Sequence, residues 1–226
     1  MYRDSSGKRL VDYPRPSVAV DTAVLTVPDA DPRLSVLLVR RAGESRTEEW
    51  ALPGTFLHEG ETLAGAVQRS LREKAGLTPE VAPRQLHVFD DPDRDDRGWV
   101  LSVAHVAALP WRAVAPVLGA RPEGVVARPV DEVRGLLFDH DEIVRRAAAD
   151  MRAAYRERPD PDRLLDEPFT MRELFRLHDA VAGGLGYSAD TFRRAMLPML
   201  EETQRRSEGT VGKPAQLYRR TSVSAG

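Results

Sequence analysis

The first 160 residues alternate between short apolar runs and polar segments, and each run predicts one element. Segments rich in apolar residues predict strands, at 17–27, 34–39, 85–89, 99–109 and 122–128, and only the segment 34–39 is apolar almost without interruption. Apolar positions that recur every three or four residues predict helices at 62–77 and 141–156, with a helical turn at 131–136. Strands mixed with helices of this length are typical of a layered α/β domain.

The last 60 residues follow a different pattern. Thr170 and Glu173 form a capping-box sequence that predicts a helix start, and Ser188 is a suitable cap for a second helix. The segments 199–204 and 216–219 then predict a hairpin. Two helices followed by a hairpin are typical of a winged helix-turn-helix.

These two patterns divide the chain. The segment between them is charged and carries Pro159, Pro161 and Pro168, which is typical of a linker. The predicted organisation is a flexible amino terminus at 1–15, an α/β domain at 16–157, a linker at 158–168 and a winged helix-turn-helix domain at 169–226.

Composition narrows the class of protein. The 226 residues include no cysteine, which excludes disulfides, zinc-thiolate sites and thiol catalysis and fits the reducing cytoplasm. No apolar run approaches 18 residues, so we expect no membrane span. The net charge is -2, yet the residues from Ser188 onward include seven basic and four acidic side chains, a local balance of +3. This local excess favours a DNA-binding surface, although a solvated helix face would carry the same charges.

The candidate DNA contacts come from the second helix and the hairpin. Arginine recognises guanine in the major groove, so Arg193 and Arg194 are the first candidates for base contacts. Four further residues are candidates for phosphate contacts or contacts at the helix start: Ser188, Thr191, Lys213 and Arg219.

The stretch 50–77 joins a strand end, a Pro53-Gly54 turn, a loop and the first predicted helix, and it resembles a Nudix box. The matching positions are Glu61, Arg69, Leu71, Glu73, Gly76 and Leu77. The family pattern has a glycine where this chain has Thr55, and it has glutamates where this chain has Ser70 and Lys74. The resemblance implies that Gly54, Glu61, Arg69 and Gly76 support the fold.

The two missing glutamates decide the expected chemistry. Positions 70, 73 and 74 would share one face of an α-helix, where enzymes of the family hold divalent cations with three carboxylates. Only Glu73 remains, and Lys74 places a positive charge at the metal position. The five histidines show no metal-ligand spacing. We therefore expect no catalytic residue, no Mg²⁺ site and no required cofactor.

The rest of the chain is similar to the Nudix-related transcriptional regulators of the NrtR family. The similar segments are 169–174, 190–194 and 212–219, together with Tyr13-Pro-Arg-Pro16, Asp21 and Phe138-Asp-His140. The resemblance implies a Nudix-like α/β/α sandwich followed by a small winged helix-turn-helix domain. It also implies a homodimeric bacterial repressor of NAD biosynthesis and uptake genes, which binds palindromic operator DNA and senses ADP-ribose or another NAD-derived effector.

The implied ligand site lies over the box helix. A diphosphate needs cations, and Arg40, Arg41 and Lys74 are candidates to supply them through charge-assisted hydrogen bonds. Phe56 is a candidate aromatic wall, and Glu73 is a candidate on the same helix face. The alternatives are a solvated strand end for the two arginines, a core position for Phe56 and a solvated surface carboxylate for Glu73.

Two other functions stay open at this stage. One is an active Nudix pyrophosphatase that hydrolyses ADP-ribose-like nucleoside diphosphates, which Ser70 and Lys74 argue against. The other is an inactive Nudix scaffold whose winged domain binds protein. Salt-dependent binding to duplex DNA would argue against that second alternative.

Overall fold

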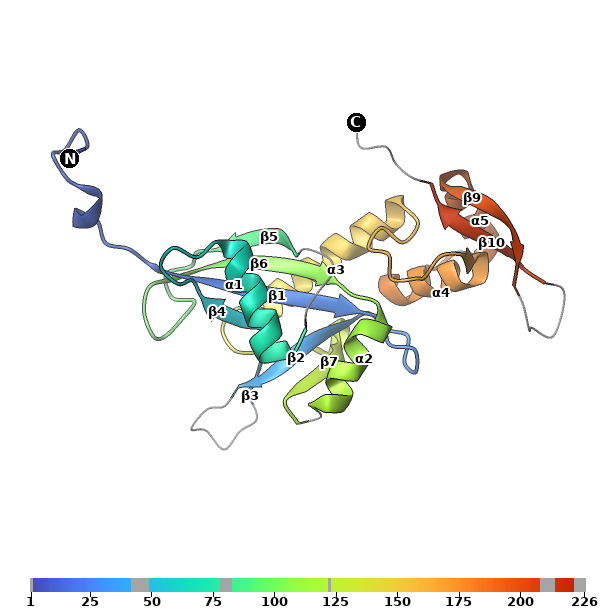
Figure 1. The fold of residues 1–226 in the computed structure, drawn as a ribbon, viewed down its shortest axis with the longest axis horizontal. Helices are drawn as coiled ribbons and strands as arrows, with labels where there is room; N and C mark the ends of the chain where they lie inside the picture. Colours follow the sequence, from blue (N-terminus) through green and yellow to red (C-terminus); the bar gives the residue numbers. More distant parts are fainter. Residues whose placement is uncertain (1, 42–48, 78–82, 122, 208–213, 222–226) are drawn as a thin grey trace.

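The computed structural model describes residues 2–41, 49–77, 83–121, 123–207 and 214–221, and it contains a seven-stranded sheet and a smaller winged part (Figure 1). The strands of the large sheet are β1 (Ser17–Thr26), β2 (Ser35–Arg41), β3 (Glu49–Ala51), β4 (Gly54–Phe56), β5 (Arg84–Phe89), β6 (Val100–Ala108) and β7 (Val125–Pro129). Their order is β3-β2-β1-β6-β5, with β4 paired to β1 and β7 paired to β2.

The sheet is mixed, because its central pair is parallel and the others are antiparallel. β1 and β6 run side by side from Ser17 opposite Val100 to Leu25 opposite Ala108. β1 is buried along most of its length, as expected for a strand that is covered on both faces. The strands predicted from apolar runs are confirmed, with small shifts at their ends.

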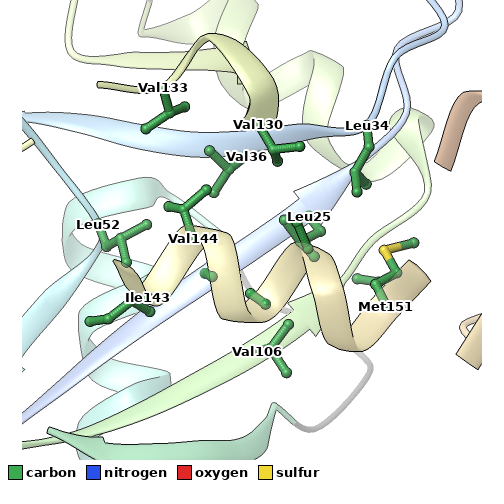
Figure 2. Close-up of a cluster of buried hydrophobic side chains, with 14 of the residues drawn as sticks. Leu25, Leu34, Val36, Leu52, Val106, Val130, Val133, Ile143, Val144 and Met151 are labelled. Carbon is green, nitrogen blue, oxygen red and sulfur yellow. The ribbon is translucent and has the colours of Figure 1, made fainter. Parts of the chain in front are cut away.

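Helices cover both faces of this sheet. The helix α1 (Leu63–Ser70), which continues as a π-helical turn at Leu71–Ala75, and α2 (Trp111–Ala120) lie over one face, and α3 (His140–Glu157) lies over the other (Figure 1). Figure 2 shows Ile143, Val144 and Met151 of α3 packed toward Leu25 and Val106 of the sheet. The three-layer α/β/α prediction is confirmed.

The structure has one helix that the sequence analysis did not predict. The helix α2 begins after Pro110, which occupies the N-cap position without a side-chain hydrogen bond. On α3 the buried face ends on Tyr155, and Ala154 is only half-buried.

The winged part contains β8 (Phe169–Thr170), α4 (Met171–Ala182), α5 (Ala189–Met196), β9 (Leu200–Arg206) and β10 (Gln216–Arg220). The three strands pair in the order β8-β10-β9. The Thr170–Glu173 capping box is present, with the Glu173 amide donating to Thr170 Oγ1 at 3.2 Å. Phe169, Phe192 and Tyr218 are fully buried between the helices and the hairpin, which confirms the winged helix-turn-helix fold.

The segment predicted as a linker, 158–168, is packed. Within the described chain it carries no helix or strand, yet the side chain of Asp160 is fully buried. Asp160 accepts hydrogen bonds from the Tyr155 hydroxyl at 2.8 Å and from the Leu164 amide at 2.9 Å, and it forms an ion pair with Arg220 of β10. A buried polar contact therefore connects the end of α3 to the wing.

The two parts also touch along α3 and α4. The Arg152 side chain donates to the Val181 carbonyl at 3.0 Å, and the Leu34 amide donates to the Ala180 carbonyl at 3.2 Å. Among the described helices, none is both long and apolar enough to cross a membrane.

Candidate ligand cleft and nucleic-acid interface

The loop and helix of the Nudix box are held together by one ion pair. Arg69 donates to both carboxylate oxygens of Glu61, at 2.9 and 2.8 Å, and to the Phe56 carbonyl at 2.9 Å. Gly76 ends the helix in the left-handed conformation with φ 69°. A side chain at Gly54 would meet Asp21, because an added Cβ would lie 1.9 Å from Asp21 Oδ1. These contacts fix β4, which carries Phe56, and the loop that follows it.

The Glu61–Arg69 pair makes stability depend on pH. Hydrogen bonds from Arg69 hold the pKa of Glu61 at about 2, below its ordinary value of 4.5. The folded state thus gains stability from the ionised carboxylate above pH 4.5 and loses this gain as the pH falls from 4.5 toward 2. We expect Glu61→Gln to lower the midpoint of thermal unfolding at pH 7, with a difference from wild type that shrinks toward pH 3.

The matched control is Glu59→Gln, since Glu59 is exposed in the same loop. This variant should follow the wild-type profile at every pH. A Glu61→Gln profile that stays parallel to wild type from pH 7 to pH 3 would show that the pair contributes no pH-dependent stability.

The three positions of the family's metal face do not converge. We expected residues 70, 73 and 74 to share a helix face, and in the structure they span the end of α1 and the π-helical turn at Leu71–Ala75. Ser70 is 1% exposed, and its hydroxyl has no hydrogen-bond partner among the described residues. Glu73 and Lys74 are both exposed, and of the three residues only Lys74 lines the cleft, where its ammonium donates to the Gly54 carbonyl.

This donor set does not fit Mg²⁺. The ion prefers about six oxygen ligands, and here a lysine ammonium lies where a carboxylate would be needed. In the described ranges, no group of three His, Cys, Asp or Glu side chains is arranged to hold a metal. Burial lowers the pKa of Lys74, although the nearby Asp21 carboxylate opposes this shift.

A cleft of about 410 Å³ opens between the box, the sheet and two loops. Two carboxylates and five cationic side chains line it: Asp21, Asp95, Arg40, Arg41, Lys74, Arg94 and Arg97. The excess of positive charge favours an anionic ligand. Of the candidate ligand residues, Arg40, Arg41, Phe56 and Lys74 lie in the wall, and Phe56 is 38% exposed. Glu73 is not among the described lining residues, and its assignment to the ligand site stays a prediction.

A buried polar network forms the floor of the cleft. Asp21 accepts a hydrogen bond from Ser102 Oγ at 2.6 Å and lies 3.3 Å from His140 Nε2 and 3.6 Å from the Arg94 guanidinium. The Leu52 amide donates to His140 Nδ1 at 3.0 Å, which places the imidazole proton on Nε2, toward Asp21. Burial opposes ionisation of Asp21, but hydrogen bonds from His140 and Ser102 outweigh it and lower its pKa.

This network does not resemble a nucleophilic triad. The Ser102 hydroxyl donates to a carboxylate, whereas an activated serine donates to a base that can accept and transfer its proton. The arrangement instead fixes an anion at the floor and keeps the surrounding cations oriented.

Sequence reasoning missed several residues of this cleft. Arg94 and Arg97 lie in the loop between β5 and β6, where the surrounding aspartates made the segment look acidic. Arg94 binds Asp139 through two bonds of 2.8 and 2.6 Å, and Arg97 binds Asp95 through two bonds of the same lengths. No local pattern pairs residues 94 and 139. Only the similarity of Phe138-Asp-His140 to the regulator family pointed to this region.

The described candidate DNA-contact residues of the winged part lie at the start of α5, on α5 and on β10. Ser188 caps α5, because its hydroxyl accepts a hydrogen bond from the Thr191 amide at 3.2 Å. Arg193 and Arg194 are exposed, and the Arg193 guanidinium donates to the Tyr218 hydroxyl at 3.2 Å. Arg219 is exposed on β10. The predicted contact Lys213 lies outside the described residues.

Comparison with known proteins places the chain in a family. The NUDIX domain model matches residues 18–158, and the NrtR DNA-binding winged helix domain model matches residues 162–220. NrtR of Shewanella oneidensis is 30% identical, with a TM-score of 0.73 over 90% of this chain and 94% of that chain. The chain belongs to the NrtR family of Nudix-related regulators. The predicted resemblance is confirmed over both parts of the chain.

Other relatives show what members of the Nudix and NrtR families bind. The Shewanella NrtR has been solved with a 27mer DNA, at 29% identity and a TM-score of 0.72 over 90% of this chain and 93% of that chain. Its NUDIX domain has been solved with ADP ribose, at 27% identity and a TM-score of 0.53 over 65% of this chain and 95% of that chain. An ADP-ribose pyrophosphatase of Methanocaldococcus jannaschii is 34% identical over 145 residues, which cover 63% of this chain and 78% of the relative.

Proposed function

We propose that this chain is a DNA-binding transcriptional repressor of NAD biosynthesis or uptake genes, with a Nudix domain that senses ADP-ribose or a related NAD metabolite. The observation that carries the proposal is Lys74. Its ammonium lies in the cleft where the Nudix enzymes carry a metal-binding carboxylate, in a chain that also carries an NrtR winged helix domain. The Shewanella NrtR solved with DNA supports the DNA-binding role, and its NUDIX domain solved with ADP ribose supports the sensing role.

In this proposal the diphosphate of the effector is neutralised by the chain itself. Lys74, Arg40 and Arg41 line one cleft, and charge-assisted hydrogen bonds from ammonium and guanidinium groups to phosphate are stronger than neutral ones. Arg94 and Arg97 are already held by Asp139 and Asp95, which offset their charges, so Lys74, Arg40 and Arg41 supply the positive charge for the diphosphate in this proposal. Binding then needs no metal ion.

The protein would act in the cytoplasm as a homodimer on palindromic operator DNA, with α5 in the major groove. The effector changes DNA binding only if it prefers one arrangement of the winged domains over the other. The direct test is the anisotropy of labelled duplex from upstream of the host's NAD-synthesis genes, with and without ADP-ribose. Selective binding that ADP-ribose weakens is expected. Selective binding that ADP-ribose leaves unchanged would contradict the effector, and absence of selective binding would contradict the regulator.

The second candidate function is an active pyrophosphatase, which the 34% identity to the Methanocaldococcus jannaschii enzyme favours. Its test is release of AMP from ADP-ribose in the presence of Mg²⁺. The cleft described above predicts no turnover above the level of a heat-denatured sample. Substantial release of AMP that depends on Mg²⁺ would overturn the non-catalytic assignment.

Reversal of one charge in the cleft should affect ADP-ribose binding without affecting DNA binding. We expect Lys74→Glu to weaken ADP-ribose binding at least about tenfold, because a cation that faces the diphosphate becomes an anion. DNA binding without the effector should stay at the wild-type level, since Lys74 lies in the Nudix part. The measurement is calorimetry for ADP-ribose and anisotropy for DNA.

The control for this prediction is Lys8→Glu, which makes the same charge change on the exposed amino-terminal arm. It should leave both affinities unchanged. Equal loss of ADP-ribose binding in the two variants would point to net charge and not to the cleft.

A further inference from the structure

Phe138 has an unusual backbone at the mouth of the cleft. Its φ of 56° lies in the left-handed region, which bulky side chains rarely adopt. The strain is held by neighbours: Asp139 binds Arg94, and the Asp141 carboxylate accepts hydrogen bonds from the Gly135 and Leu136 amides at 2.8 and 3.0 Å. These contacts hold the backbone after Phe138 in place, and they thereby fix the direction of its ring.

The ring lies where two hollows meet. It lines both the cleft and an adjoining groove of about 550 Å³, and Arg41, Arg94 and Arg97 line both hollows as well. The ring is half-buried and packs edge-on against His140 of the cleft floor, with ring centroids 5.5 Å apart. A fixed aromatic ring therefore stands beside the positive wall.

Two arginines cover this ring. The Arg97 guanidinium lies 5.0 Å from the Phe138 centroid and the Arg41 guanidinium lies 5.4 Å from it. Arg97 is anchored by its two bonds to Asp95. Arg41 forms no ion pair with another described residue, so the chain holds it on the ring less firmly. A planar guanidinium stacks on an aromatic ring as a nucleobase does.

We propose that Phe138 is the residue that stacks on the base of the ligand, and that Arg41 occupies the position of the base in the ligand-free protein. This inference rests on the proposed function, because it assumes that a ligand with a diphosphate binds in this cleft. The ligand class is a nucleoside diphosphate with a planar base. When the base covers the ring, Arg41 turns to the phosphate oxygens. Phe138 thus selects for a nucleoside over a base-free phosphorylated sugar.

The test compares two probes by calorimetry: ADP-ribose, which carries adenine, and inorganic pyrophosphate, which has no base. Stacking of one base on an aromatic side chain is lost when the ring is removed, so Phe138→Leu should weaken ADP-ribose binding about 10- to 100-fold. Its affinity for pyrophosphate should stay within about twofold of wild type. Phe138→Tyr keeps the ring and should keep both affinities.

Phe56→Leu is the comparison variant, because Phe56 also lines the cleft and lies 5.3 Å from the Arg97 guanidinium, so it tests which of the two rings stacks on the base. The matched control is Tyr187→Leu, since Tyr187 is an exposed aromatic residue of the winged part, and this variant should leave both affinities unchanged. A second readout is the fluorescence of an etheno-adenine analogue of ADP-ribose, which stacking quenches. Phe138→Leu should abolish this quenching, and Phe56→Leu should retain most of it.

The outcomes separate this inference from the proposed function. Wild-type protein that binds ADP-ribose, together with Phe138→Leu protein that binds it equally well, overturns the stacking assignment alone. Loss in Phe56→Leu but not in Phe138→Leu also overturns it. Wild-type protein that does not bind ADP-ribose overturns both. Loss of both probes in a Phe138→Leu protein with a wild-type unfolding midpoint assigns Phe138 to the shape of the cleft and contradicts base selection.

Discussion

Replacement of Asp160 by alanine is expected to destabilise the protein by about 3 kcal/mol or more. The Asp160 side chain is fully buried and is bound by Arg220, Tyr155 and the amides of Leu164 and Leu165. Removal of the carboxylate leaves these donors unpaired, and each unpaired buried group costs free energy. Arg220 keeps Glu167 as a second partner at 2.6 Å, which places the expected loss toward the lower end of the range for broken buried ion pairs.

The loss is measured as the change in the midpoint and free energy of urea unfolding. The control is Asp166→Ala, because the Asp166 side chain is 73% exposed and pairs only with the exposed Arg112 among the described residues. This control should change stability by less than about 0.5 kcal/mol. A loss below about 1 kcal/mol in Asp160→Ala would show that the buried network contributes little.

The second large effect concerns DNA. Arg193→Ala is expected to weaken operator binding by about 5- to 150-fold, the range for loss of one arginine–guanine contact, and to weaken binding to random duplex much less. The geometry gives the reason. Arg193 is exposed on α5, and the Tyr218 hydroxyl at 3.2 Å fixes its guanidinium relative to the wing. Tyr218→Phe removes only that hydroxyl and should cause a smaller loss in the same direction.

The measurement is anisotropy on operator and scrambled duplexes at the same salt concentration, because phosphate contacts vary with salt. Arg156→Ala is the control, since Arg156 is an exposed arginine at the end of α3, outside the winged part. Equal loss on both duplexes would reduce Arg193 to a phosphate contact. An unchanged operator affinity would remove it from the interface.

Local patterns were sufficient for most of the fold. β1 and β6 were predictable because long, mainly apolar segments rich in Val and Ala are typical of buried strands. The starts of α4 and α5 were predictable because Thr170 and Ser188 bond to amides three residues away. Each of these features depends on residues that are close in sequence.

The cleft was only partly predictable, because its geometry depends on distant residues. Arg94 is positioned by Asp139, and Asp21 is held by Ser102 and His140. None of these pairs leaves a periodic signal. The π-helical turn at Leu71–Ala75 was equally hidden, because no pattern in the box distinguishes it from a regular helix.

The helix α3 has a consequence for how such a protein can change over evolution. Its first residue, His140, lies on the cleft floor, and Tyr155 near its end binds Asp160, which binds the wing strand. At 1.5 Å per residue its 18 residues form a rod of about 27 Å without glycine or proline. A tilt of about 4° at one end would displace the other by about 2 Å. Substitutions in the cleft wall that do not touch α3 can therefore alter which metabolite is detected while the connection to the wing is inherited unchanged.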